Sequence, residues 1–160
     1  MQFLEKNLED IIFNTPNHLL RERGLAIYGK KKRQVRIGNY GVADILVFDK
    51  GLYYTTTESE SFRYGLCINV LELKQEQINV STLLQATRYA KGISSYLTKY
   101  RKVYYPVRVC LIGSSIDKQT SFPYLSDFLF EFMSIYTYKY DFDGIKFNRE
   151  FDYKLPVEGF

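Results

Sequence analysis

One short stretch, residues 68–75 (INVLELKQ), constrains the fold of this chain more than any other. Its apolar residues predict a buried strand, and the charged side chains of Glu72 and Lys74 interrupt the pattern at its end. Because side chains alternate along a strand, Glu72 and Lys74 point to one face, and Leu71 and Leu73 point to the other. Burying a charge without a partner or a metal is strongly unfavourable. Either these charges face water at an ordinary strand end, or they belong to a site.

The size and composition of the chain are those of a globular protein. With 160 residues, 46% hydrophobic and 25% charged, we expect one domain that spans residues 1–160. No apolar run approaches the about 20 residues of a membrane helix, and the N-terminus lacks the pattern of a signal peptide. We therefore expect a cytoplasmic protein with no membrane partner. Cys67 and Cys110 lie in apolar segments, which predicts buried free thiols.

Hydrophobic periodicity and turn residues predict a mixed arrangement of helices and strands. The predicted helices cover residues 3–13, 82–98 and 121–133, with Ser81 as N-cap of the second. The predicted strands cover residues 25–28, 34–37, 42–48, 66–74, 103–114, 135–140 and 145–153; residues 49–51 close one strand with a turn, residues 52–65 form a hairpin excursion with a polar tip, and residues 141–144 form a hairpin turn. This order predicts an α/β fold, with a mixed central sheet flanked by helices and a C-terminal β-hairpin.

The helix over residues 82–98 is the most regular of these elements, and its apolar stripe predicts the face that it buries. The stripe consists of Ala86, Tyr89, Ala90, Ile93, Tyr96 and Leu97. Gln85 lies four residues before Tyr89 on one flank of the stripe.

Acidic residues recur where apolar patterns predict burial. Asp44 interrupts the apolar strand 42–48, and Glu5 and Glu9 flank the apolar stripe of the first helix. Since paired strands lie about 4.8 Å apart, Asp44 and Glu72 can converge on one point. Converging carboxylates repel one another unless a cation lies between them, and oxygen ligands suit Mg²⁺ or Mn²⁺. Next to such a metal, Lys74 can position or deprotonate a water or neutralise charge on a phosphate, which is the chemistry of phosphodiester hydrolysis.

Four pieces of sequence, in this order, resemble the PD-(D/E)XK nuclease superfamily, above all its NucS-like and RecB-like branches. They are residues 7–12 (NLEDII) followed by Thr15 and Pro16, residues 41–46 (GVADIL), residues 70–74 (VLELK) and residues 85–90 (QATRYA). The resemblance covers residues 4–97. It implies a restriction-endonuclease-like core and a Mg²⁺-dependent phosphodiesterase that acts on DNA in preference to RNA, as an endo- or exonuclease. Homodimers are common among small nucleases of this kind, and the resemblance leaves the oligomeric state open.

The resemblance also implies roles for the residues that match. Asp44 and Glu72 would hold the metal together with the backbone carbonyl of Leu73, and Lys74 would orient or activate the attacking water. A glutamate of the first helix would complete the metal site, and its sequence context favours Glu9 over Glu5.

Two further features of the resemblance are less specific. Gln85 would support the site and Tyr89 would pack beneath it, although a position beside the apolar stripe explains both residues equally well. Gln34 also has a counterpart in that branch, but an ordinary position at a strand edge explains it as well. The separation of Asp44 and Glu72 is longer than in the NucS-like branch because of residues 52–65, which would make a DNA or an oligomer contact.

Basic residues supply candidate contacts to nucleic acid. We expect Arg88, Lys91, Lys32, Arg33 and Arg101 to contact phosphates, whereas the simpler alternative is that they lie in solvent. Two other functions stay open at this point. One is a non-catalytic nucleic-acid-binding module on the same fold, and the other is a protein-interaction module whose interface is the tyrosine-rich hairpin of residues 52–65.

Overall fold

The computed structural model describes residues 5–55, 61–102, 105–119, 122 and 133–150, with the backbone alone for residues 51–55 and 61–64. The helices are α1 (Glu5–Asn14), α2 (Asn17–Glu22), the 3-10 turn η1 (Gly38–Tyr40), α3 (Val80–Tyr96) and the π-helical turn η2 (Leu97–Arg101). The strands are β1 (Lys30–Arg36), β2 (Val42–Thr55), β3 (Ser61–Leu73), β4 (Gln77–Ile78), β5 (Val107–Gly113), β6 (Ser115–Ile116), β7 (Met133–Asp141) and β8 (Gly144–Arg149).

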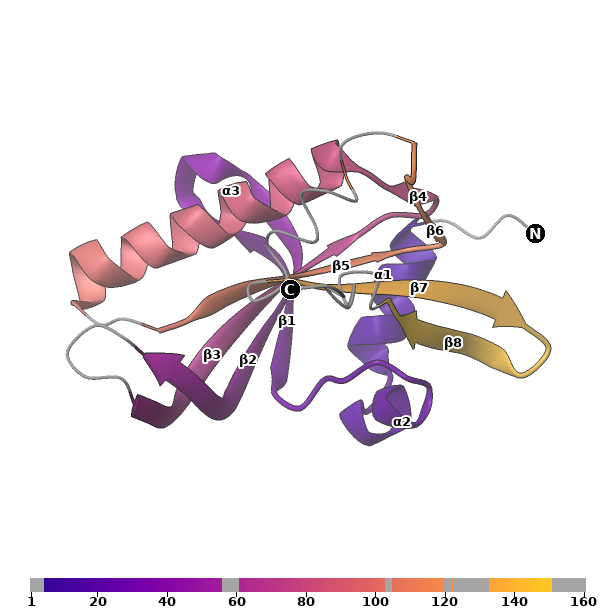
Figure 1. The fold of residues 1–160 in the computed structure, drawn as a ribbon, viewed down its shortest axis with the longest axis horizontal. Coiled ribbons are helices and arrows are strands. Elements are labelled where there is room, and N and C mark those ends of the chain that lie inside the picture. Colours follow the sequence, from indigo (N-terminus) through magenta and orange to yellow (C-terminus); the bar gives the residue numbers. More distant parts are fainter. Residues whose placement is uncertain (1–4, 56–60, 103–104, 120–121, 123–132, 151–160) are drawn as a thin grey trace, which may run out of the picture.

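Six of these strands form one mixed sheet in the order β1-β2-β3-β5-β7-β8 (Figure 1). The strands β1, β2 and β3 pair antiparallel, β3, β5 and β7 pair parallel, and β8 returns antiparallel to β7. The structure thus confirms the α/β class, the mixed central sheet flanked by helices and the β-hairpin near the C-terminus. A second, parallel pair of β4 and β6 was not predicted, because two-residue strands carry no periodicity.

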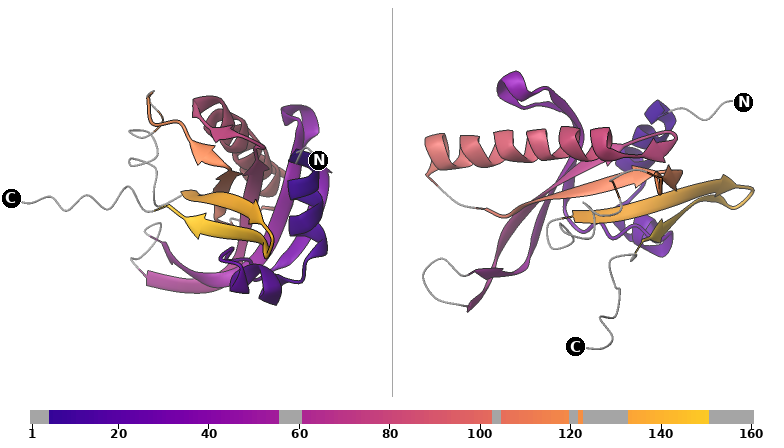
Figure 2. Two further views of the ribbon diagram at one scale, coloured as in Figure 1. Left: turned by 90° about the vertical axis from the view of Figure 1, so that its right-hand side faces the viewer. Right: turned by 45° about the horizontal axis from the view of Figure 1, so that its top comes forward.

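The sheet has a hydrophobic core on each face, and a helix covers each core. On one face, Leu8 and Ile12 of α1 pack with strand residues such as Leu71. On the other face, α3 packs its buried stripe, which includes Leu83 and Ala86, against further strand residues. The first panel of Figure 2 shows α1 and α3 on opposite sides of the strands. No helix in the described ranges is long and apolar enough to cross a membrane.

Two of the predicted elements are wrong. Residues 25–28 are not a strand; Leu25 and Ile27 are buried, but the Ile27 N–H donates to the Leu25 carbonyl in a tight local turn. Residues 49–51 do not form a turn, because β2 runs on and pairs Asp49 with Cys67 and Gly51 with Gly65. Residues 52–65 are therefore the outer part of the β2–β3 pair, and the tip at residues 56–60 lies outside the described residues.

The second predicted helix, α3, begins earlier than expected. Its N-cap is Asn79, not Ser81, and a capping box joins the Asn79 and Thr82 side chains reciprocally to each other's backbone N–H groups. Tyr96 was expected in the buried stripe but is 50% exposed, because Leu97 continues the stripe after Ile93 and leaves Tyr96 on its edge. The predicted helix at 121–133 lies almost wholly outside the described residues, and Met133 begins β7.

Candidate active site

Asp44 lies at an interruption of the sheet between β1 and β2. Pairing on either side of it is regular, with Arg33 opposite Ile45 and Val35 opposite Ala43, but the position between these pairs is skipped. Gln34 occupies that position on β1 with a φ of 51°, which is a left-handed conformation that a non-glycine residue rarely adopts. Exposed and half-buried residues still alternate along β1, so sequence periodicity gives no sign of this distortion.

The pairing of β2 with β3 also ends beside Asp44. Its last pair is Ile45 with Leu71, so Asp44 and Glu72 are the next residues along the two strands. Asp44 Oδ2 accepts a hydrogen bond of 3.1 Å from the backbone N–H of Leu73. The side chain of Asp44 thus takes a place that a strand carbonyl would otherwise fill, at the point where the two strands separate.

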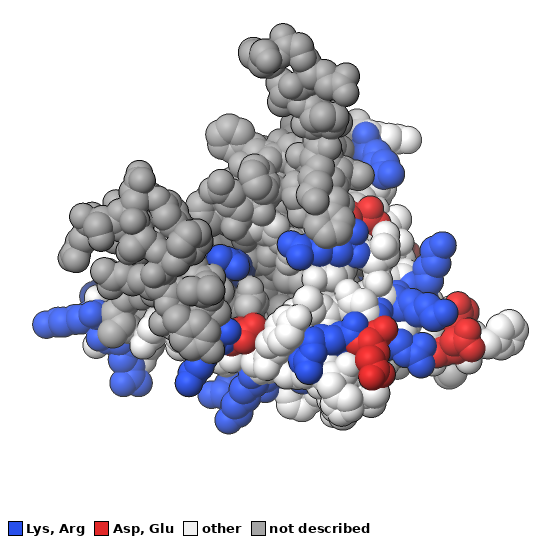
Figure 3. All heavy atoms as spheres, turned by 60° about the horizontal axis from the view of Figure 1, so that its bottom comes forward, with Lys and Arg blue, Asp and Glu red and all other residues white. Residues whose placement is uncertain are grey.

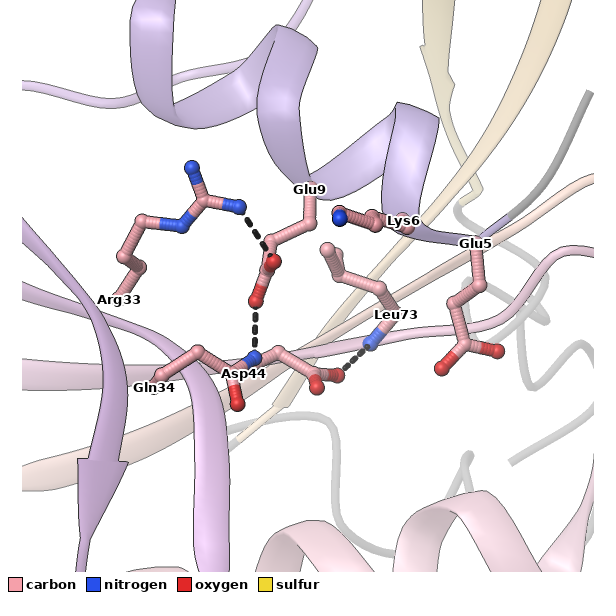
Figure 4. Close-up of a pocket in the computed structure, with 7 residues that line it drawn as sticks. All are labelled: Glu5, Lys6, Glu9, Arg33, Gln34, Asp44 and Leu73. Atoms are coloured by element: carbon pink, nitrogen blue, oxygen red, sulfur yellow. Dashed lines mark hydrogen bonds and ion pairs between the residues drawn. The ribbon is translucent and has the colours of Figure 1, made fainter.

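A pocket of about 410 Å³ opens at this point (Figure 4). Its walls come from α1, β1, β2 and β3, which are far apart in the sequence but meet here. The lining residues are Glu5, Lys6, Glu9, Arg33, Gln34, Asp44 and Leu73. Of the predicted site residues, the pocket is lined by Asp44, Glu9, Leu73, Arg33 and the rival glutamate Glu5, whereas Glu72, Lys74 and Gln85 do not line it.

The carboxylate of Glu9 is held by two side chains of β1. Arg33 Nη2 donates to Glu9 Oε2 at 2.6 Å, and Gln34 Nε2 donates to Glu9 Oε1. Arg33 Nη2 also donates to Asp10 Oδ1 at 2.5 Å, so the predicted phosphate contact Arg33 is engaged by two carboxylates. Glu9 itself is buried, and both of its oxygens accept a hydrogen bond. These contacts join α1 to the edge strand across one side of the pocket.

Glu5 lies one helical turn before Glu9 on α1, and it is half-buried. No residue in the described part of the chain donates a hydrogen bond to its carboxylate. Its charge raises the pKa values of both Asp44 and Glu72, whereas Glu9 raises that of Asp44. Glu5 therefore lies within electrostatic reach of both strand carboxylates.

Burial dominates the electrostatics of Asp44. Burial, with smaller contributions from the charges of Glu5 and Glu9, raises the pKa of Asp44 to about 6, against the effect of the hydrogen bond from Leu73. The positive charge of Lys74 acts in the opposite direction.

Glu72 is buried more deeply than Asp44. It is 2% exposed, and its Oε2 has no hydrogen-bond partner among the residues that the structure describes. Burial, followed by the charge of Asp44, raises the pKa of Glu72 to about 8, and Lys74 opposes the shift. A cation that approaches this buried carboxyl group would stabilise its charged form.

Lys74 follows directly after β3 and is half-buried, and its backbone N–H donates to the Ile112 carbonyl at 2.8 Å. Its charge acts on both Asp44 and Glu72, so the predicted Glu-x-Lys pair and the predicted aspartate share one electrostatic environment. Within the described ranges, no group of three or more His, Cys, Asp or Glu side chains is already spaced to hold a metal ion. A shared cation would require the carboxylates to move closer together.

Gln85 and Tyr89 form a pair on α3, with Gln85 Nε2 donating to Tyr89 Oη at 2.8 Å. Tyr89 is buried against Gly41, where an added Cβ would lie 2.9 Å from the tyrosine ring. The Tyr89 ring therefore packs against Gly41, the residue just before β2 begins at Val42. Gln85 does not line the pocket, and its contact is the tyrosine.

The other predicted nucleic-acid contacts, Lys32, Arg88, Lys91 and Arg101, are exposed. Lys32 lies on the edge strand with its Nζ 5.5 Å from the centre of the Phe48 ring, and the other three lie on α3 and η2. Figure 3 shows Lys and Arg spread widely over one face of the molecule. Among the residues that line the pocket, Lys6 is the one that the sequence does not single out. The resemblance pointed to Gln34, but nothing in the sequence revealed its left-handed backbone.

Comparison of the chain with known protein families, with characterised proteins and with solved structures finds no match.

Proposed function

We propose that this protein is a metal-dependent nuclease with a restriction-endonuclease-like core, and that it hydrolyses phosphodiester bonds in DNA. The observation that carries the proposal is the buried Glu72, whose Oε2 lacks a partner among the described residues, next to Asp44 where β2 and β3 separate. Stability alone gives no reason to bury two neighbouring carboxyl groups with raised pKa values.

The oxygen donors at this point fit Mg²⁺ or Mn²⁺ as the cofactor. Asp44, Glu72 and the backbone carbonyl of Leu73 would hold the ion, with a glutamate of α1 completing the set. In a metal site without its cation, buried carboxylates lack a compensating positive charge. The unpartnered Oε2 of Glu72 and the raised pKa of Asp44 fit that state. When bound, the ion supplies positive charge that polarises the phosphate and makes a coordinated water more acidic.

The pocket favours Glu5 over Glu9 as the glutamate of α1 that faces the ion. Both oxygens of Glu9 already accept hydrogen bonds from Arg33 and Gln34, whereas Glu5 has no such donor in the described part of the chain. We assign Glu9 to holding α1 against β1, which fixes the position of Glu5. The sequence resemblance alone favours the opposite assignment.

Lys74 is the residue that we assign to the attacking water. Its charge already acts on both carboxylates, so its ammonium group lies near the place where the reaction would occur. There it can hold a water for attack or offset the negative charge that grows on the phosphate. Lys6 lines the same pocket and is exposed, so it can contact an incoming phosphate.

The test is cleavage of plasmid, linear DNA and RNA in Mg²⁺, in Mn²⁺ and in EDTA. We expect metal-dependent cleavage of DNA that Asp44→Asn and Lys74→Ala each reduce by about 100-fold or more. The matched control is Asp143→Asn, at an exposed carboxylate in the β7–β8 turn. Cleavage that both site variants retain would contradict the assignment. Tight DNA binding without cleavage in any metal would point to the non-catalytic binding module.

A further inference from the structure

The last residue of α3 and the η2 turn that follows it expose two tyrosines that lie outside the hydrophobic core. Tyr96 is 50% exposed and Tyr100 is 64% exposed. Their ring centroids lie 5.3 Å apart with an interplanar angle of 40°, so the rings form one aromatic surface. Lys99 Nζ lies 5.3 Å from the centre of the Tyr100 ring. Exposed aromatic rings beside cations are the usual components of a surface that stacks bases.

The charge of this segment has one sign. Residues 80–102 contain Arg88, Lys91, Lys99, Arg101 and Lys102 and no Asp or Glu. All five are exposed. Arg88 and Lys91 are three residues apart and share the solvent face of α3, and Lys99 follows in η2. A positive track therefore leads along α3 to the two tyrosines.

Helix stability explains only part of this arrangement. Basic residues near a helix C-terminus interact favourably with the helix dipole, which accounts for Lys99, Arg101 and Lys102. That effect does not reach Arg88 and Lys91 in the middle of α3, which have no acidic residue on their own helix to pair with. Nor does it explain why two aromatic rings stay half or more exposed.

We propose that Tyr96 and Tyr100 form a platform on which bases of a single-stranded nucleic acid stack, with the cations of α3 and η2 contacting its phosphates. Stacking on a side chain requires unpaired bases, and a duplex hides the faces of its bases. The platform lies at the end of α3 that is remote from α1, as the views in Figures 1 and 2 agree. It is thus separate from the pocket, and it deepens the proposed function by naming single strands as the substrate class.

The inference depends on the proposed function only in taking a nucleic acid as the partner, and its test requires no cleavage. Full-length protein in EDTA at low salt is titrated into fluorescein-labelled oligo(dT) of 15 nucleotides and into a 15-base-pair duplex, and anisotropy is read. We expect the wild type to bind the single strand more tightly than the duplex. The double variant Tyr96→Ala, Tyr100→Ala should weaken oligo(dT) binding about tenfold or more.

Two further variants separate stacking from general effects. The double variant Tyr96→Phe, Tyr100→Phe keeps the rings and should bind oligo(dT) within about twofold of the wild type. Tyr140→Ala removes a tyrosine that is 59% exposed on β7 and should have no effect. Circular dichroism confirms that each variant keeps its helix content.

Three results would overturn the platform. They are equal or tighter binding of the duplex, unchanged oligo(dT) binding by the double alanine variant, and displacement of oligo(dT) by polyglutamate at equal charge. Oligo(dT) binding through the tyrosines in a protein that cleaves no DNA would support the platform and reject the nuclease. If the protein cleaves DNA but its tyrosine variants bind oligo(dT) normally, the result would support the nuclease and reject the platform.

Discussion

At the scale of single residues, the site depends on carboxyl groups in places that disfavour their charge. Asp44 and Glu72 could be identified from the sequence because each interrupts an apolar strand. The hydrogen bonds around Glu9 could not be identified in this way. They join residues more than 20 positions apart, and one of the two donors, Gln34, has a left-handed backbone. Strained backbone of this kind gathers at functional sites, and no hydrophobic pattern encodes it.

The raised pKa of Glu72 makes the stability of the metal-free protein depend on pH. The ordinary pKa of the group is 4.5 and its pKa in the folded protein is about 8, so the folded state holds the proton more tightly. Its contribution to stability is fully present below pH 4.5 and is lost as the pH rises through 8. We expect the free energy of unfolding in EDTA to fall between pH 5 and pH 8, and Glu72→Gln to flatten that fall. Urea unfolding at intervals across this range measures it.

Glu76→Gln is the matched control for this experiment, since Glu76 is exposed and lies only four residues away. Its profile should follow that of the wild type. If Glu72→Gln also leaves the profile unchanged, the carboxyl group of Glu72 is not desolvated in the folded protein.

Glu9 and Glu5 should respond differently to the same substitution. Glu9→Ala removes the acceptor that Arg33 and Gln34 share, which should lower the free energy of unfolding by about 1–3 kcal/mol. Glu5→Ala removes a half-buried carboxylate without a donor in the described part of the chain, so stability should change by about 0.5 kcal/mol or less. Metal-dependent cleavage should nevertheless fall in Glu5→Ala. Chemical unfolding and a cleavage assay on both variants check this. If Glu5→Ala is stable and fully active, Glu9 is the glutamate of α1 that faces the ion.

At the scale of elements, turn-forming residues predicted the ends of strands less reliably than hydrophobic periodicity predicted the strands themselves. Asp49, Lys50 and Gly51 resemble a hairpin turn, yet they are paired residues within β2. Local propensity favours a turn there, but continuous pairing with β3 outweighs it, as tertiary context often does for strands. The start of α3 shows the same limit on a smaller scale, because Asn79 and Ser81 are both good N-caps and the sequence does not decide between them.

The capping box gives a direct test of where α3 begins. Asn79→Ala removes the acceptor for the Thr82 N–H and should lower the free energy of unfolding by about 0.5–2 kcal/mol. Ser81→Ala changes an exposed residue within the first turn and should cost much less. Thermal unfolding of the two variants side by side measures the difference. An equal loss in both would place the cap at Ser81.

At the scale of the whole molecule, the class of the fold follows from the order of its apolar segments. Strands that are apolar on both sides require a helix layer on each face of the sheet, and α1 and α3 provide these layers. The pocket follows from the same architecture, because it forms beneath α1 where β2 and β3 separate and the pairing of β1 with β2 is interrupted. What the order of segments does not determine is how far each strand pair extends, and this decides where the carboxylates meet.

Adding or removing the metal tests whether these parts act as one site. In EDTA, Asp44→Asn should melt about 2–6 °C above the wild type, because asparagine keeps an oxygen for the Leu73 N–H and removes a buried charge near Glu5 and Glu9. Mg²⁺ at 100 times its Kd should stabilise the wild type by about 2.7 kcal/mol and leave Asp44→Asn nearly unchanged. Differential scanning fluorimetry across a Mg²⁺ titration measures both effects. A drop of several degrees for Asp44→Asn in EDTA would show that the charge of Asp44 serves its hydrogen bond to Leu73, and that the carboxylates are not poised for a cation.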